Sequence, residues 1–285
     1  MQLTSKSQTI RKTSFRIFVY VILILSTIIM MIPFAWMLSS SLMKESDMFQ
    51  IPPVWIPNPP QFNNYTEIWG ILPFDAFFRN TVVLTVGRIL PLLFSCSLAA
   101  FGFARLKSRK KNILFLIMIS TMMLPGQVTM IPLYILFAKI GWVNTFLPLI
   151  VPSFFGIPFY IFMMRQFFMT IPIEYDESAR IDGASTFQIF YKIILPLSKP
   201  ALVTMTIFLF MWSWNDFFTP LIYLHDTNKY PLALGLQLFR TYGEYSTRWD
   251  YIMAGSLLMA IPPLLVFFFA QKYFVEGVTV TGLKG

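Results

Sequence analysis

Polar side chains that could do chemistry gather in two short stretches of an otherwise apolar chain. The first, ESARIDGA, runs from Glu177 to Ala184 and combines acidic, basic and small residues. The second, WND, runs from Trp214 to Asp216 and sets an amide and a carboxylate among aromatic rings. The first stretch is typical of a charged helix, and the second combines ring faces with hydrogen-bonding groups, which suits sugar rings.

The residues that usually build catalytic or metal sites are scarce. Cys96 is the single cysteine and His225 the single histidine, so an internal disulfide is excluded and neither residue has a partner at metal-ligand spacing. We interpret Cys96 as a buried small hydrophobe and His225 as a surface-loop residue. The chain lacks the G-x-x-x-x-G-K-[ST], G-x-S-x-G and H-E-x-x-H motifs. The sequence predicts no enzymatic activity, no metal and no cofactor, and excludes ATP binding through a phosphate loop.

Long apolar segments must position the two polar stretches. Hydrophobic residues make up 56% of the 285 residues and charged residues 12%, about half the charged fraction of a soluble domain. Runs that exceed or approach the roughly 20 helical residues needed to cross a bilayer lie at 17–38, 80–103, 113–138, 147–168, 201–224 and 251–271. Because backbone groups inside lipid must be paired, the sequence predicts an all-α integral membrane protein with six transmembrane helices.

The positions of Lys and Arg predict the orientation of these helices. The formal charge is +9, but the basic residues cluster in short segments between the apolar runs. That distribution is typical of cytoplasmic loops and argues against nucleic acid as a partner. The first run follows basic residues without a cleavage site, so we interpret it as a retained signal anchor. We expect a multi-pass protein of the plasma or inner membrane with both termini in the cytoplasm.

This orientation divides the chain into five predicted segments. The external loop at 39–78 contains IPPVWIPNPPQFNNY, and proline at this density favours an extended backbone. It is either a stiff linker or a loop that contacts a partner. The segments are a cytoplasmic tail at 1–16, a first membrane helix at 17–38, an external loop at 39–78, a core of five helices at 79–272 and a cytoplasmic tail at 273–285.

Proline and glycine interrupt two of the core runs. Both residue types remove or strain helical hydrogen bonds, and freed carbonyls inside a membrane are tolerated where neighbours or water satisfy them. The breaks therefore lie either near a solute pathway or at simple structural kinks. They are at Pro125, Gly126 and Pro132 in the third run and at Pro152, Gly156 and Pro158 in the fourth.

The cytoplasmic segment 170–200 predicts two short helices joined by a tight turn. Gly183 is placed to end the first helix in a left-handed conformation, and Arg180 can pair with an acid three or four residues earlier. Ser185 and Gln188 form a capping box for the second helix. The result is either a compact knob that receives a soluble partner or an ordinary interfacial loop. Acids that suit the N-terminus of the first helix are Glu174, Asp176 and Glu177.

The segment ESARIDGASTFQIFYKIILPLSKPAL closely resembles the E-A-A-x-x-x-G signature of ABC-importer permeases. Glu177, Ser178 and Ala179 stand at the E-A-A positions and Gly183 at the glycine, with serine as a small replacement for the middle alanine. The resemblance covers most of the chain from about residue 33. Within the family, the sequence is similar to the carbohydrate, maltose-permease-like group. Further matching stretches are IPLY, RQFF, WND, NYTEIW and the tail QKYFVEGVTVTGLKG.

The resemblance implies a type I ABC importer permease fold and import of sugars or oligosaccharides. Two related permease subunits would form the pathway, a pair of separate ATPase subunits would bind ATP, and an external solute-binding protein would deliver the sugar. The resemblance further implies that the cytoplasmic knob is a coupling helix on which an ATPase presses. Its coupling residues would be Glu177, Ser178, Ala179, Arg180, Asp182, Gly183 and Ala184.

Residues that touch the solute are a separate question. Polar residues deep in a membrane helix are costly and are usually functional or paired. They line the pathway, or they form an interhelical hydrogen bond or lie at headgroup level. The pathway candidates are Gln127, Trp214, Asn215 and Asp216.

Two other functions stay open. An importer permease for a non-sugar solute, such as a glycerophosphodiester or polyol, would carry the same motifs. A phosphorylated solute would need Arg or Lys facing the pathway, and only Arg88 lies well inside a predicted helix. A membrane scaffold that binds a partner without transport is the alternative from another class, and it would not need broken helices.

Overall fold

The computed structural model describes residues 3–240 and 247–282, with side chains described for 13–240 and 247–271. Every regular element in these ranges is helical, as predicted. The ends of the two predicted cytoplasmic tails, residues 1–2 and 283–285, lie outside the described residues. The chain divides into two compact units. We call residues 1–68 with 239–258 the α1 unit, and residues 69–238 with 259–285 the α3 unit.

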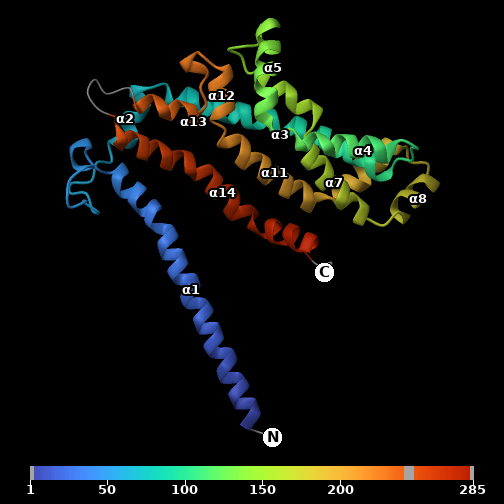
Figure 1. The fold of residues 1–285 in the computed structure, drawn as a ribbon, viewed down its shortest axis with the longest axis horizontal. Coiled ribbons are helices and arrows are strands. Elements are labelled where there is room, and N and C mark those ends of the chain that lie inside the picture. Colours follow the sequence, from blue (N-terminus) through green and yellow to red (C-terminus); the bar gives the residue numbers. More distant parts are fainter. Residues whose placement is uncertain (1–2, 241–246, 283–285) are drawn as a thin grey trace. The chain divides into compact units, whose positions relative to one another are not determined.

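The longer helices are labelled in Figure 1. In chain order the elements are α1 (Leu3–Ser41), η1 (Glu45–Asp47), α2 (Asn64–Ile71), α3 (Phe74–Arg105), α4 (Lys111–Ser120), η2 (Thr121–Met123), α5 (Gly126–Lys139), α6 (Leu147–Ile150), η3 (Val151–Phe155), α7 (Pro158–Thr170), α8 (Glu174–Ile181), α9 (Thr186–Ile189), η4 (Phe190–Ile194), α10 (Leu195–Leu197), α11 (Lys199–Trp214), α12 (Phe218–Tyr223), η5 (Thr227–Lys229), α13 (Leu232–Gly235), η6 (Leu236–Arg240) and α14 (Trp249–Gly282).

The described residues contain four helical segments long and apolar enough to span a membrane. They are 13–41, 74–105, 147–170 and 249–271. Two further pairs of helices meet the same test together but are bent, by 94° between η2 and α5 and by 77° between α10 and α11. The predicted six membrane helices are obtained when each bent pair counts as one span.

One predicted run breaks near the expected place, and another breaks where no break was predicted. The third run turns sharply at Leu124 and Pro125, as expected, but the interruption predicted at Pro132 is wrong, because Pro132 lies inside the continuous helix α5. The fifth run was predicted as one helix over 201–224, and that is wrong, because α11 ends at Trp214 and α12 begins only at Phe218. Asp216 explains the break, since its carboxylate accepts a hydrogen bond from the backbone N–H of Thr219 and so caps a new helix.

The α3 unit is built around α3. Every fourth residue from Leu84 to Ala100 is buried, so these positions form one stripe along the helix. The stripe packs against α7 and α11, which run beside α3 (Figure 1). Arg88 is the charged member of this otherwise small or apolar stripe. The stripe consists of Leu84, Arg88, Leu92, Cys96 and Ala100.

The fourth run shows how proline and glycine shape the same unit. Gly156 has a φ of +77° and ends η3, a conformation that a side chain with a Cβ resists. Pro158 then begins α7, where its missing N–H removes no helical bond. The predicted break in this run is therefore confirmed.

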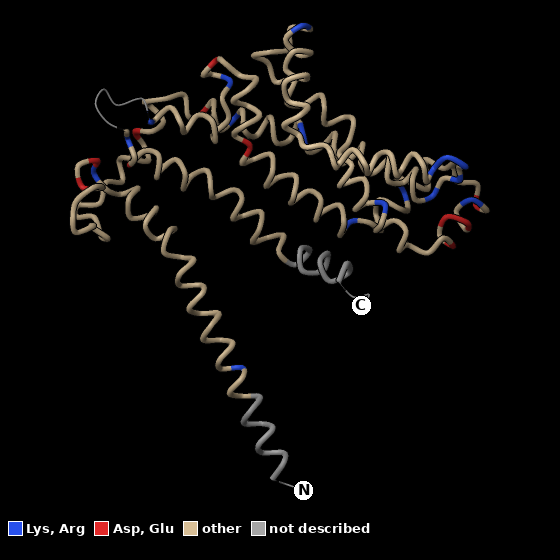
Figure 2. The backbone as a smooth tube through the Cα atoms, viewed as in Figure 1, with Lys and Arg blue, Asp and Glu red and all other residues tan. Residues whose placement is uncertain are grey.

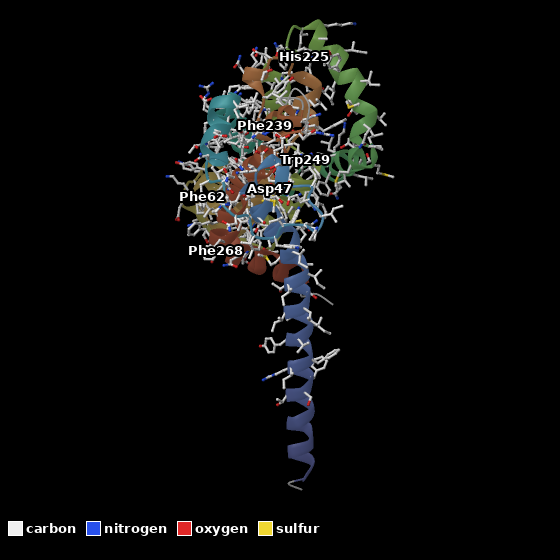
Figure 3. All side chains as sticks on the ribbon, turned by 90° about the vertical axis from the view of Figure 1, so that its left-hand side faces the viewer. Asp47, Phe62, His225, Phe239, Trp249 and Phe268 are labelled. Carbon is white, nitrogen blue, oxygen red and sulfur yellow. The ribbon has the colours of Figure 1, made fainter. Side chains whose placement is uncertain are left out.

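The α1 unit carries a candidate membrane span that the rest of this unit does not bury. None of the most apolar window of α1 is buried, and Figure 3 shows side chains projecting from all sides of this helix. Its C-terminal part contacts the proline-rich segment, because the ring centres of Trp36 and Trp55 lie 5.1 Å apart. The Nδ2 of Asn64 donates to the carbonyls of Ser41 and Met43 at 2.9 and 3.0 Å. The segment between 50 and 60 contains no helix, in agreement with its proline content.

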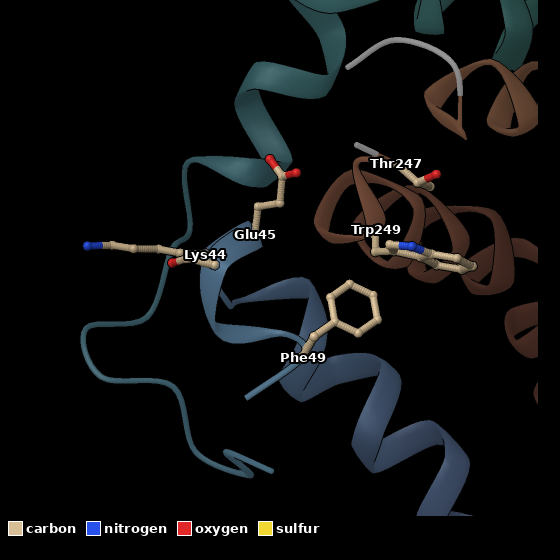
Figure 4. A pocket seen from close by; sticks show the side chains of 6 residues that line it. Lys44, Glu45, Phe49, Thr247 and Trp249 are labelled. Atoms are coloured by element: carbon tan, nitrogen blue, oxygen red, sulfur yellow. The ribbon is translucent and has the colours of Figure 1, made fainter. Parts of the chain in front are cut away.

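An open hollow lies on the same unit, beside the start of α14. Figure 4 shows Phe49 and Trp249 on its two sides, with Lys44, Glu45 and Thr247 around them. Arg248, next to Trp249, lies 2.7 Å from Asp250 and 3.4 Å from Glu45. The hydrogen bonds that Arg248 donates to Asp250 raise the pKa of Arg248 above its ordinary range, and these contacts hold the start of α14 in place.

Candidate coupling helix and buried polar centre

The helix α8 ends in the turn that the sequence predicts. Gly183 has a φ of +82°. Its N–H donates to the carbonyl of Arg180 at 3.1 Å, and the N–H of Ala184 donates to the carbonyl of Ala179 at 2.9 Å. These two bonds make a Schellman motif, which satisfies carbonyls that the helix end would otherwise leave free. A Cβ on Gly183 would meet no atom within 4 Å, so only the backbone conformation demands glycine here.

The second helix of the knob begins at once. The N–H of Gln188 donates to Ser185 Oγ at 3.3 Å, and the N–H of Ser185 donates to Gln188 Oε1 at 2.7 Å. The predicted capping box is therefore confirmed. The helix that follows widens into a π-helical turn, η4, before α10.

The predicted coupling residues divide between two faces of the knob. Ala179 is buried and Ala184 is half-buried, so they hold the knob to the α3 unit. The rest point outward: Glu177, Ser178, Arg180, Asp182 and Gly183 are exposed.

Large apolar side chains surround the exposed residues of the knob, and the sequence analysis missed them. Ile181 is 86% exposed at the end of α8. Tyr175, Phe187 and Tyr191 are also about half exposed or more. Exposed apolar groups next to charged ones are typical of a surface that another protein covers.

Charge distribution places the knob among basic residues. Figure 2 shows Lys and Arg gathered at the end of the α3 unit where α3 turns into α4 and where α8 lies. The basic residues of this cluster come from two segments, 105–111 and 165–199, which both fall in or beside gaps between the predicted apolar runs.

Beneath α8, a carboxylate is buried against an arginine. The Asp176 side chain is fully buried and its Oδ2 lies 3.6 Å from Nε of Arg105, the last residue of α3. Nη2 of Arg105 also donates to the carbonyl of Ile171 at 2.7 Å. Burial raises the pKa of Asp176 above its ordinary range, and the nearby Arg105 opposes that shift. Arg180, whose spacing allows it to pair with Asp176 or Glu177, makes no ion pair with either of them within the described residues.

A second buried ion pair lies in the middle of α3. Nη1 of Arg88 is 2.7 Å from Oδ2 of Asp216, with the side chains 2% and 9% exposed. Nε of Arg88 donates to the carbonyl of Leu149 at 2.9 Å, and the guanidinium lies 5.2 Å from the ring centre of Trp212. Since Asp216 also caps α12, this pair joins α3, α6 and the start of α12.

The four pathway candidates do not form one cluster. Trp214 is buried, with its ring against Phe78 and Phe210 and its Nε1 donating to the carbonyl of Met259 at 3.0 Å. Asn215 is exposed and donates to the carbonyl of Met211 at 2.8 Å. Gln127 is exposed in the first turn of α5. Only Asp216 pairs with Arg88.

The two lone residues lie as the sequence suggested. Cys96 is fully buried in the core of the α3 unit, where the N–H of Ile157 donates to its Sγ at 3.3 Å. His225 is exposed in a loop. The described part of the chain contains no group of three or more His, Cys, Asp or Glu residues placed to hold a metal.

Comparison with known proteins assigns the chain to a family. A family model described as a binding-protein-dependent transport system inner membrane component matches residues 92–280. The arabinooligosaccharides transport system permease protein AraQ of Bacillus subtilis is 35% identical over 226 residues, or 79% of each chain. The sn-glycerol-3-phosphate transport system permease protein UgpE of Pectobacterium atrosepticum is 31% identical over 271 residues, or 92% of this chain and 95% of that protein.

A solved structure agrees with this assignment. The structure of a bacterial ABC transporter involved in the import of the acidic polysaccharide alginate contains a chain that aligns with a TM-score of 0.79. The alignment has 25% sequence identity and covers 92% of this chain and 97% of that chain. The importer permease fold expected from the sequence is therefore confirmed, and the protein belongs to the family of inner membrane components of binding-protein-dependent transport systems.

Proposed function

We propose that this chain is a permease subunit of an ATP-driven, binding-protein-dependent importer, and that α8 is its coupling helix. The main observation that supports the coupling role is how α8 is held. A Schellman turn and a buried underside fix the helix, while its outer face is exposed. Such a helix can dock into a cleft of an ATPase subunit without changing its own shape. The coupling residues are those of the exposed face together with Ala179 and Ala184, which hold it in place.

The proposed solute is a sugar or oligosaccharide. The names of the arabinooligosaccharide permease and of the alginate transporter support this class. The ion pair of Arg88 also supports a sugar over a phosphorylated solute, because this guanidinium is already neutralised by Asp216 and is not free to bind a phosphate. Asn215 and Gln127, which are exposed, are proposed to line the pathway, with Trp214 and Asp216 holding the break that precedes α12.

The partners follow from the same role. They are a pair of ATPase subunits, a second related permease, an external solute-binding protein and the surrounding lipid. The span of α1 supports an assembly in the membrane, since its own unit buries none of its most apolar part. Both termini are proposed to lie in the cytoplasm, and the loop at 39–78 is proposed to lie on the outside. The five-helix core is proposed to span 79–272.

Affinity purification tests this proposal. The tagged protein is isolated in mild detergent from the membranes of its own host, and the co-purifying proteins are identified by mass spectrometry. We expect an ATPase with a phosphate-loop motif and a second permease of the same family. Recovery of this chain alone, even after crosslinking, would contradict the importer role and favour a scaffold.

A glycerol phosphate or related solute is the second candidate, because the relative UgpE is named for sn-glycerol-3-phosphate transport. Binding of labelled solutes to the co-purified binding protein separates the two. A neutral oligosaccharide that binds, with no competition from sn-glycerol-3-phosphate, supports the first candidate. The reverse result supports the second.

A further inference from the structure

Asp176 is a buried acid that docking alone does not explain. Glu177, the next residue, is exposed, whereas the Asp176 side chain is fully buried on the same side of α8 as Ala179. A helix that only presents a surface to a partner would turn apolar residues toward its own protein. Burying a carboxylate there costs desolvation free energy, so its role must be sought in what it contacts.

The contact is Arg105, and Arg105 joins two segments. Its Nη2 donates to the carbonyl of Ile171, just before α8, while its Nε faces Asp176 inside α8. Arg105 is also the last residue of α3, where a cation is favoured by the helix dipole. Because α3 packs against both α7 and α11, one guanidinium connects the knob to the central helix of the unit.

The side chains of Arg105 and Asp176 lie close together but are not hydrogen-bonded to each other. Neither carboxylate oxygen of Asp176 accepts a hydrogen bond, and Nε of Arg105 donates none, within the described residues. The separation of 3.6 Å exceeds the roughly 2.7–2.9 Å of a charge-assisted hydrogen bond. A displacement of α8 by about 1 Å would close that gap, and the attraction between buried charges rises steeply as they approach.

We propose that Arg105 and Asp176 are the positioning pair that passes the displacement of α8 to α3. When an ATPase presses on α8, the carboxylate closes onto the guanidinium and the end of α3 moves with the coupling helix. This inference rests on the coupling role proposed above. The pair passes the movement to α3, the helix that also carries Arg88.

The test measures movement of α3 in the assembled transporter. A cysteine replaces Arg79, an exposed residue near the other end of α3, and its labelling by a maleimide is followed with and without ATP, Mg²⁺ and vanadate. The buried Cys96 adds little background. We expect Asp176→Asn and Arg105→Gln to reduce the ATP-dependent change in labelling roughly fivefold or more, the lower end of typical coupling, while the ATPase still co-purifies.

Two matched variants give the result its meaning. Asp176→Glu keeps the charge and reaches further, so it should retain the ATP response. Glu174→Gln removes an exposed acid from the same helix and should also retain it. An unchanged response in Asp176→Asn would overturn the inference. So would loss of ATPase binding in Asp176→Asn without rescue by glutamate, because that result indicates a purely structural role.

The proposed function fails in a different way. If the unmodified chain binds no ATPase subunit and its Arg79→Cys reporter does not respond to ATP, the coupling role of α8 is itself contradicted. If the unmodified chain binds the ATPase and responds while Asp176→Asn behaves identically, only the positioning pair is contradicted.

Discussion

Two buried arginine–aspartate pairs lie on α3, and they differ in how completely they are bonded. Arg88 and Asp216 are 2.7 Å apart, and each has a further partner: the carbonyl of Leu149 for the arginine and the N–H of Thr219 for the acid. Arg105 and Asp176 are 3.6 Å apart, and Asp176 accepts no hydrogen bond within the described residues.

This difference in hydrogen bonding determines what each pair can do. The Arg88 pair satisfies groups that broken helices leave free. One is the carbonyl of Leu149, which receives a hydrogen bond from Arg88. In a 3₁₀ turn this carbonyl would pair with the residue three positions later, but that residue is Pro152, which has no N–H. Moving such a pair would break good bonds and gain none. The Arg105 pair gains bonds when it moves, because its charges are buried but not yet joined. The first arrangement holds a fixed shape, and the second favours motion.

Removing Arg88 should give the largest effect. Arg88→Ala leaves the Asp216 carboxylate buried without its cation, which typically costs about 3–5 kcal/mol. We expect the detergent-solubilised complex to unfold at a clearly lower temperature, measured by thermal denaturation followed by size exclusion. The double variant Arg88→Ala with Asp216→Ala should recover part of the loss. A double variant no more stable than the single one would mean that the pair does not act as a unit.

The exposed tip of α8 should give the next largest effect. Burial of an isoleucine side chain is worth about 1.5–3 kcal/mol, so Ile181→Ser should weaken ATPase binding by roughly tenfold or more. The measurement is titration of the ATPase onto the permeases in nanodiscs. Ile51, which is 96% exposed in the loop predicted to be external, provides the matched control, and Ile51→Ser should leave that affinity unchanged. Equal effects of the two variants would contradict docking at α8.

The turn after α8 should give a smaller change in free energy with a clear functional result. Gly183→Val forces a β-branched residue to a φ of +82°, a strain of about 1–2 kcal/mol. We expect lost solute uptake in vesicles while the subunit remains in the membrane. Gly183→Asn is the control, since asparagine tolerates the left-handed region. Normal uptake by the valine variant would count against α8 as the coupling helix.

Local sequence signals predicted the knob well. A Schellman turn needs one glycine, and a capping box needs a serine and a glutamine three residues apart, so Gly183, Ser185 and Gln188 are sufficient. Proline and glycine likewise marked the breaks at Pro125 and Gly156, because their effect on the backbone is local.

Tertiary pairing could not be predicted in the same way. Asp216 meets an arginine 128 residues away, and no local rule links the two. The break after Trp214 was missed because the apolar run continues beyond it to Leu224, while the cap that causes it depends on Asp216 turning back to Thr219. Helix spacing allowed Arg180 to pair with Asp176 or Glu177, but the ion-pair partner of Asp176 is Arg105, which lies far away in the sequence.

Replacing only the charge of Asp216 should have the smallest effect of the series on solute uptake. The substitution Asp216→Asn keeps the shape of the side chain and an oxygen for Arg88 or Thr219, so the geometry around α12 should persist. Since Asp216 is engaged with Arg88, we expect an unchanged KM for solute uptake, together with a loss of thermal stability because the buried Arg88 keeps its charge without a counter-charge. Asn215→Ala is the matched comparison, because Asn215 is exposed and is proposed to face the solute. A KM that rises several-fold in Asp216→Asn but not in Asn215→Ala would reverse these roles and make the Arg88 pair part of the solute site rather than a fixed support.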